Sequence, residues 1–210
     1  MSSTPRKILI GLPAYRFTSY TGLTISLAAA MGQLHRYPLL SVCDFKAIGH
    51  VLIDECRNML VQEALTHEAD WLLMLDDDAS FEAIAPWELI MMAEAFGATV
   101  AGLPYPIRGT GEPCVEQLPE VRKGFKPCER IGAGVMAIDL AKLGRWRPWF
   151  ISTPQPQGGS YSEDYYFCDQ VREKGGSVFC DWRHPAGNGN VRAWAPTESP
   201  DGEKPPGENT

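Results

Sequence analysis

Three aspartates, Asp76, Asp77 and Asp78, follow directly after the apolar run DWLLML at residues 70–75. Adjacent carboxylates repel one another unless water, hydrogen-bond donors or a cation offsets the repulsion. The side chains of Asp76 and Asp78 point the same way if the chain is extended, so both can reach one cation. Carboxylate oxygens suit Mg²⁺ or Mn²⁺, and a metal held there can bridge to a diphosphate and neutralise charge on a leaving group. A solvated acidic turn is the alternative interpretation.

A second pair of acids, Glu163 and Asp164, lies in the segment GGSYSEDYYF at residues 158–167. One of them, with Asp164 favoured, has the chemistry of a general base that takes a proton from an acceptor hydroxyl. The alternative is local. Ser160 and Glu163 have the S-x-x-E spacing of a capping box, and acids in a first turn stabilise a helix through its dipole.

Four further residues carry weaker signals. His184 lies in a glycine-rich segment after a predicted strand, where a neutral imidazole can reach a metal or serve the structure alone. Trp182 offers a face for stacking on a sugar, or belongs to the core. Arg57 and Asn58 can contact a phosphate and a base edge or ribose, or are ordinary surface residues on the polar side of their helix.

The segments that must position these side chains alternate between strand and helix patterns. Strands are predicted at residues 7–14, 38–45, 70–75 and 99–107, and helices at 22–36, 51–68 and 85–97. This order predicts an α/β fold with an open sheet, whose ligands bind outside the carboxyl ends of the strands. The three aspartates lie at such an end, as do Pro13 and Tyr105.

The second half of the chain is less regular. Residues 108–128 contain several glycines and prolines and predict a loop or a small hairpin. Residues 130–144 predict a glycine-rich turn, a strand and a short helix, and Gly132 and Gly134 in this turn indicate close approach of the backbone to a ligand. A helix is predicted at 162–176, followed by a strand.

The composition is that of one globular domain, with 44% hydrophobic and 21% charged residues in a chain of 210. The net charge of −7 repels polyanions and counts against non-specific binding of nucleic acid. We expect a domain at 1–192 and a flexible Pro/Gly/Glu-rich tail at 193–210. There is no signal-peptide pattern, no CxxC pair among the six cysteines and no apolar run of the roughly 18–20 residues that cross a bilayer. A cytoplasmic protein with reduced thiols, in the host cytoplasm if a phage encodes it, and without membrane contact, is the expectation.

The order of these segments resembles the GT-A fold nucleotide-sugar glycosyltransferases, of the short, family 2-like kind met in phages and bacteria. The resemblance spans about residues 7–190 and rests on GLPAY, CRNMLVQEAL, DWLLMLDDDAS, VAGLPYPIR, GAGVMAI, SEDYYFCDQVREKG and a final D-x-x-H. It implies a Rossmann-like open mixed sheet in a single domain. It also implies metal-dependent transfer of a sugar from a nucleotide-diphosphate sugar to an acceptor hydroxyl, with Mn²⁺ or Mg²⁺ as cofactor and a UDP-sugar as the expected donor. The acceptor (glycan, protein, small molecule or modified DNA base), the stereochemistry and the oligomeric state stay open.

The resemblance also assigns roles to individual residues. The acids at 76–78 match the D-x-D motif, with Asp76 near the ribose or metal and Asp78 as the main metal ligand. His184 matches the late metal-binding histidine, and Glu163 with Asp164 matches an E-D pair whose aspartate is the base in inverting members. The implied contacts to the nucleotide-sugar are Pro13, Ala14, Tyr15, Arg57, Asn58, Asp76, Asp77 and Tyr105. The implied acceptor side consists of Gly132, Gly134 and Trp182.

Two other functions remain open. Asp76, Asp78 and Ser80 also fit the D-x-D-x-[T/S] motif of haloacid-dehalogenase-like phosphotransferases. In that class the motif normally ends the first strand, whereas here it follows the third. A non-catalytic nucleotide-sugar-binding or assembly protein would keep the same fold and bind its ligand without turnover.

Overall fold

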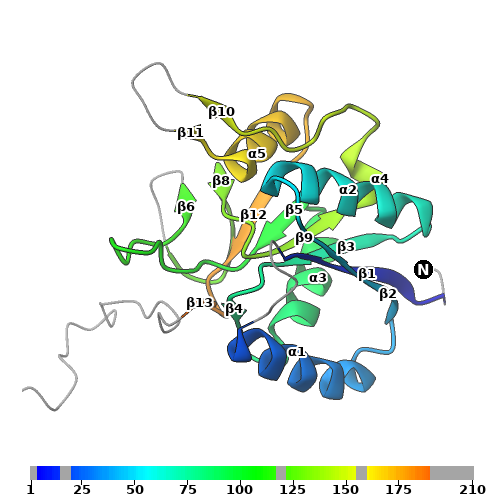
Figure 1. The fold of residues 1–210 in the computed structure, drawn as a ribbon. Helices are drawn as coiled ribbons and strands as arrows, with labels where there is room; N and C mark the ends of the chain where they lie inside the picture. Colours follow the sequence, from blue (N-terminus) through cyan, green and yellow to red (C-terminus); the bar gives the residue numbers. More distant parts are fainter. Residues whose placement is uncertain (1–3, 15–19, 117–121, 155–159, 190–210) are drawn as a thin grey trace, which may run out of the picture.

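The computed structural model describes residues 4–14, 20–116, 122–154 and 160–189 (Figure 1). The predicted tail at 193–210, and with it the boundary of the predicted domain, lies outside these ranges. None of the helices in the described ranges has the length and apolar character needed to cross a bilayer.

The centre of the fold is a mixed seven-stranded sheet in the order β2-β1-β3-β9-β5-β12-β7. Its strands are β1 (Arg6–Pro13), β2 (Leu40–Ile48), β3 (Trp71–Leu75), β5 (Val100–Gly102), β7 (Phe125–Pro127), β9 (Val135–Asp139) and β12 (Val178–Asp181). β1 is parallel to both β2 and β3, and β5 is parallel to β12. β9 is antiparallel to β3 and β5, and β7 is antiparallel to β12.

Three short two-stranded sheets lie outside the main sheet. They pair β4 (Ala79–Ser80) with β13 (Gly187–Asn188), β6 (Val115–Glu116) with β8 (Arg130–Ile131), and β10 (Thr153–Pro154) with β11 (Ser160–Tyr161). The first of these pairs joins the chain just after the three aspartates to the last described segment, so two distant parts of the sequence meet there.

Helices cover both faces of the main sheet. They are α1 (Thr21–Gln33) with a following 3₁₀ turn at Leu34–Arg36, α2 (Ile53–Thr66), α3 (Ala85–Phe96), α4 (Leu140–Leu143) and α5 (Glu163–Glu173). Neighbouring residues of β3 point to opposite faces. Leu72 packs in one core cluster with Leu60 of α2, and Leu73 packs in a second cluster with Leu23 of α1 and Leu89 of α3. Figure 1 shows these two layers, with α2, α4 and α5 on one side of the sheet and α1 and α3 on the other.

This architecture confirms the predicted α/β fold with an open mixed sheet in a single domain. α3 ends where its sequence predicts, because Gly97 adopts a left-handed conformation with φ of 69°. The six cysteines are all free in the structure.

Two local predictions are wrong. The segment 108–128 was expected to hold only a loop or a small hairpin, but it contributes β7 to the main sheet. Phe125 of β7 stacks on Phe179 of β12, with ring centroids 5.0 Å apart, which anchors this edge strand.

The capping box is not formed either: α5 begins at Glu163 with Ser162 at the N-cap position, and no side chain caps the helix.

Candidate functional site

The sheet topology brings the carboxyl ends of several strands to one edge. β9 is antiparallel to both β3 and β5, so β1, β3, β5 and β12 all run in one direction, and β9 begins where they end. Pro13 ends β1, Asp76 follows β3, Tyr105 follows β5 and Gly134 precedes β9. These residues therefore meet at the edge where an open α/β sheet binds its ligands.

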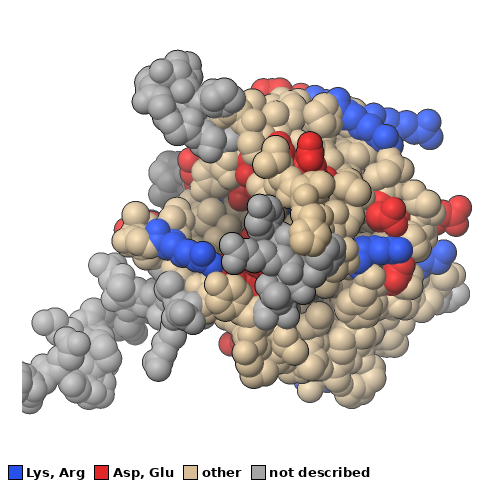
Figure 2. Space-filling model, viewed as in Figure 1, with Lys and Arg blue, Asp and Glu red and all other residues tan. Residues whose placement is uncertain are grey.

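A cavity of about 490 Å³ lies at this edge, and we call it the aspartate pocket. It is lined by Pro13, Ile53, Arg57, Asp76, Asp77, Asp78, Tyr105, Ile107, Arg108, Cys114, Ser162, Asp164 and Asn188. Seven of these residues belong to the set that the sequence predicted. Figure 2 shows Asp and Glu side chains scattered over the face in view, with Lys and Arg side chains toward its left and right sides.

Arg57 forms the buried centre of the charge network. Its side chain comes from α2 and only 3% of the residue is exposed, so the alternative that Arg57 is an ordinary surface residue is wrong. The Arg57 guanidinium donates to Asp76 Oδ1 at 2.8 Å and also contacts Glu163. Burial raises the pKa of Asp76 and of Glu163, and the charge of Arg57 opposes both shifts. One arginine thus holds carboxylates from two different elements in place.

Asp78 is held from two sides. Its carboxylate forms an ion pair with Arg108, and its backbone oxygen accepts a hydrogen bond of 2.7 Å from the Gly189 amide. The Arg108 side chain is 59% exposed and comes from the segment after β5, whereas the Asp78 side chain is mostly buried. The cation of an exposed side chain therefore lies on the carboxylate that was predicted to be the main metal ligand.

Asp164 lines the pocket, while its neighbour Glu163 turns to Arg57. Asp164 Oδ2 accepts a hydrogen bond of 3.1 Å from the Ala133 amide, and Oδ1 accepts one of 2.8 Å from the Tyr165 amide and contacts the Ser162 hydroxyl. A carboxylate has about four lone-pair sites, so one remains for a proton from a ligand. The two members of the E-D pair consequently have different surroundings.

The Tyr105 ring packs on a backbone surface made by two glycines. A Cβ added at Gly134 would lie 2.7 Å from Tyr105 Cε1, and one added at Gly132 would overlap the Tyr105 hydroxyl and the Cys114 sulfur. The close approach predicted for these glycines therefore exists, but the group that approaches is a side chain of the protein, Tyr105. Burial raises the pKa of the Tyr105 hydroxyl and of the Cys114 thiol.

The structure places two predicted site residues away from the pocket. His184 Nδ1 lies 3.1 Å from Glu82 Oε2 and Nε2 lies 3.0 Å from Glu88 Oε2, so within the described residues its ring does not join the aspartates. His184 follows β12 in the chain, and its imidazole contacts Glu88 of α3 instead of the pocket. The amide of Asn58 bonds to the backbone of Trp149 and Phe150 instead of facing the pocket.

The remaining predicted residues have structural surroundings. Trp182 is buried in the core cluster beneath α2 and α5, which agrees with the core interpretation of this residue. Ala14 is buried, and its amide donates a hydrogen bond of 2.9 Å to the Ile48 oxygen. Tyr15 lies outside the described residues.

Sequence reasoning missed the other six pocket residues, which are Ile53, Ile107, Arg108, Cys114, Ser162 and Asn188. Arg108 ends the quoted segment VAGLPYPIR, and a basic residue just after a strand end was a usable signal. Cys114 directly precedes β6 and Asn188 ends β13, two short strands that the sequence pattern does not predict.

The donor atoms of the pocket fit a hard divalent cation. Asp76 and Asp78 both line the cavity, and Mg²⁺ is usually held by one or two carboxylates together with the oxygens of a substrate phosphate. Among the described residues, no group of three or more His, Cys, Asp and Glu side chains is arranged to hold a metal by itself. A divalent cation in this pocket would therefore have two carboxylates available, and one of them, Asp78, is paired with Arg108.

The fold and the position of the pocket define a GT-A-like, Rossmann-like α/β protein. The solved structures that resemble it include A197 from STIV, with a TM-score of 0.56 and 15% identity over 86% of this chain and 84% of that one. They also include GalNAc-T7 with UDP, GalNAc and Mn²⁺, with a TM-score of 0.51 and 12% identity over 94% of this chain and 46% of that one. The chain therefore spans about half the length of GalNAc-T7. No protein-family model and no curated protein matches the sequence.

Proposed function

We propose that this protein transfers a sugar from a nucleotide-diphosphate sugar to an acceptor hydroxyl. The observation that carries the proposal is the aspartate pocket, which gathers Asp76, Asp78 and Asp164 at the carboxyl edge of a GT-A-like sheet. UDP is the expected nucleotide. Its support is the sequence resemblance, together with the presence of UDP and Mn²⁺ in the GalNAc-T7 structure.

Asp78, with Asp76 beside it, would hold Mn²⁺ or Mg²⁺ against the diphosphate. A bound divalent cation supplies charge neutralisation to the departing diphosphate. Arg108, once it leaves Asp78, is close enough to the same place to contact a phosphate oxygen. Arg57 and Glu163 would act as positioning residues, because Arg57 binds Asp76 and Glu163 in turn contacts Arg57.

Asp164 is the proposed base. Its two amide hydrogen bonds hold the carboxylate in one orientation at the pocket wall, where it can take the proton of the incoming hydroxyl. The Ser162 hydroxyl contacts Asp164 Oδ1, the oxygen that also accepts from the Tyr165 amide, and restrains the carboxylate further.

The proposal is tested with the Asp164→Asn variant. The parent should release UDP from a UDP-sugar when an acceptor is supplied, and Asp164→Asn should lose transfer by about 10²-fold or more while it still binds UDP. Normal transfer by Asp164→Asn would remove this residue from the mechanism. UDP binding by the parent with no turnover on any donor would instead support the non-catalytic binding protein.

The phosphotransferase hypothesis has less support. A nucleophilic aspartate must be free to attack phosphorus, whereas Asp76 is bound by a buried arginine. The antiparallel strand β9 beside β3 also belongs to the GT-A-like topology.

A further inference from the structure

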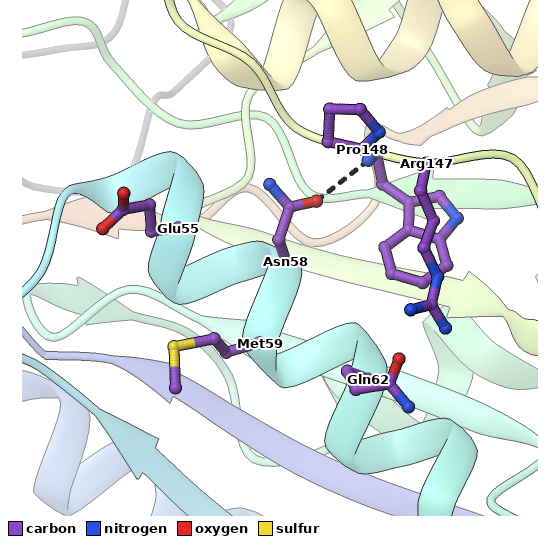
Figure 3. A pocket seen from close by; sticks show the side chains of 7 residues that line it. Glu55, Asn58, Met59, Gln62, Arg147 and Pro148 are labelled. Atoms are coloured by element: carbon purple, nitrogen blue, oxygen red, sulfur yellow. Dashed lines mark hydrogen bonds between the residues drawn. The ribbon is translucent and has the colours of Figure 1, made fainter.

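A second cavity, of about 440 Å³, lies on the side of α2 that faces away from the sheet, and we call it the α2 cavity (Figure 3). It is lined by Glu55, Asn58, Met59 and Gln62 of α2 and by Arg147, Pro148 and Trp149 of the segment after α4. Its lining shares no residue with that of the aspartate pocket. Its volume lies within the range of roughly 300–1,000 Å³ that is usual for small-molecule sites.

Two buried polar atoms of this lining lack a hydrogen-bond partner among the described residues. They are Trp149 Nε1 and Gln62 Oε1. Trp149 is only 2% exposed, so its indole lies away from bulk solvent. Buried polar groups are nearly always paired, since an unpaired one costs free energy. A donor and an acceptor that both stay unpaired in the wall of one cavity indicate a missing partner.

The cavity is built before any ligand arrives. The Asn58 amide donates to the Phe150 oxygen at 2.7 Å and accepts from the amides of Trp149 and Phe150 at 2.9 and 3.1 Å. Figure 3 shows Asn58 between α2 and this segment, with the hydrogen bond to the segment dashed. Because these bonds hold the segment on α2 in advance, ligand binding loses less conformational entropy. The Arg147 guanidinium lies 4.9 Å from the Trp149 ring centroid, so an exposed side chain covers the indole and can move aside.

The unpaired atoms and the lining restrict the ligand. A hydroxyl group accepts a hydrogen bond from an N–H and donates one to an amide oxygen, so hydroxyl groups match both kinds of unpaired atom. Met59 and Pro148 offer apolar contact to C–H groups, and the charges of Glu55 and Arg147 balance each other at the cavity. We propose that the α2 cavity binds an uncharged saccharide unit. The proposal does not require the aspartate pocket to transfer sugar.

The test measures the indole N–H resonance of Trp149 in uniformly ¹⁵N-labelled full-length protein, assigned through its through-bond connections. Methyl glycosides of glucose, galactose, mannose and N-acetylgalactosamine are titrated to about 10 mM, so that dissociation constants up to about 1 mM, a binding free energy of about −4 kcal/mol, are detected. The expected result is a saturable shift of this resonance with at least one glycoside, since a new hydrogen bond changes the shielding of the proton. No shift with any of the four, or a shift with uridine alone, would overturn the proposal.

Three variants locate the effect. Gln62→Leu should weaken glycoside binding by about five- to tenfold. It should unfold at a temperature no lower than the parent, because it also removes an unpaired buried oxygen. Gln170→Leu on α5 is the matched control and should bind as the parent does. Asp78→Asn should also keep the shift, so a failed nucleotide site and a failed saccharide site are distinguished. Equal glycoside affinity in Gln62→Leu and the parent would contradict the proposed pairing.

Discussion

Arg57 Nη2 donates a hydrogen bond of 2.8 Å to Asp76 Oδ1, which ties the middle of α2 to the end of β3. Both groups lie at the base of the aspartate pocket, and the same guanidinium contacts Glu163 at the start of α5. The three elements that carry the candidate site are thus joined through one buried cation. The geometry of the pocket depends on this contact as much as on the sheet.

The first prediction concerns the buried network. Arg57→Ala should lower the free energy of unfolding by about 3–5 kcal/mol, because it leaves Asp76 and Glu163 in the interior without their cation. Arg6→Ala is the matched control. It removes an ion pair to Glu94 in which both side chains are over one-third exposed, and it should cost about 1 kcal/mol or less. Urea unfolding measures both values, and similar losses in the two variants would show that the network contributes little.

A second prediction separates two roles of Arg108. If its guanidinium competes with a metal for Asp78, Arg108→Ala should bind UDP at an Mn²⁺ concentration about two- to fivefold lower, since a partly exposed ion pair is worth up to about 1 kcal/mol. Calorimetric titration of Mn²⁺ in the presence of UDP measures this midpoint, with Arg36→Ala as an exposed control. Weaker UDP binding in Arg108→Ala would mean that the main role of the Arg108 guanidinium is to bind the phosphates of UDP.

The glycine surface under Tyr105 gives a third prediction. Gly134→Ala places a Cβ 2.7 Å from the ring, so Tyr105 must move. The variant should lose about 1–3 kcal/mol of stability, and UDP binding should weaken with it. Gly32→Ala in α1 has no atom within 4 Å of the new Cβ and should gain up to about 1 kcal/mol from helix propensity. Both variants carry the same chemical change, so thermal unfolding should show a lower midpoint for Gly134→Ala and an equal or higher midpoint for Gly32→Ala than for the parent.

Cys114 provides a fourth prediction, on pH. Burial raises the pKa of this thiol above its ordinary value, so the neutral thiol persists past the pH at which a free cysteine ionises, about 8.5. Since the thiolate is the nucleophile, alkylation by iodoacetamide should be slow at pH 7 and should accelerate as the pH rises above that value.

Because Cys114 lines the aspartate pocket, UDP with Mn²⁺ should slow its alkylation at every pH. Mass spectrometry of the modified peptides measures both effects. The exposed Cys43 should show no protection by UDP and serves as the internal reference. Protection of both cysteines, or of neither, would argue against a ligand in this pocket.

The fold was largely predictable because its elements carry strong local signals. The apolar run before Asp76 has the length of a strand and is buried on both faces, and Gly97 marks the end of α3. The edge strand β7 lacked such a signal. It is only three residues long, and it depends on stacking with an aromatic ring from β12, a contact that no local pattern reveals.

The acidic residues of the candidate site could be predicted from the sequence, whereas the surroundings of His184 and Arg57 could not. Asp76, Asp78 and Asp164 follow from strand ends and a helix start, which the sequence defines. His184 could not be placed because its position depends on contacts with residues about 100 positions earlier, Glu82 before α3 and Glu88 on α3, which lie against its two ring nitrogens. Burial of Arg57 likewise depends on acids from β3 and α5, which the pattern of α2 does not contain.

The most direct test of the proposed function is thermal unfolding of the parent and of Asp78→Asn with UDP, in the presence and absence of Mn²⁺. UDP at about 100 times its dissociation constant should stabilise the parent by about 2.7 kcal/mol, a shift of about 5–10 °C for a chain of this size. We predict that this shift requires Mn²⁺, is lost in Asp78→Asn and is kept in Glu68→Gln, which removes an exposed charge elsewhere. An equal shift in Asp78→Asn, or no shift in the parent with UDP, GDP, CDP, dTDP or ADP, would contradict a metal-dependent nucleotide site at the three aspartates.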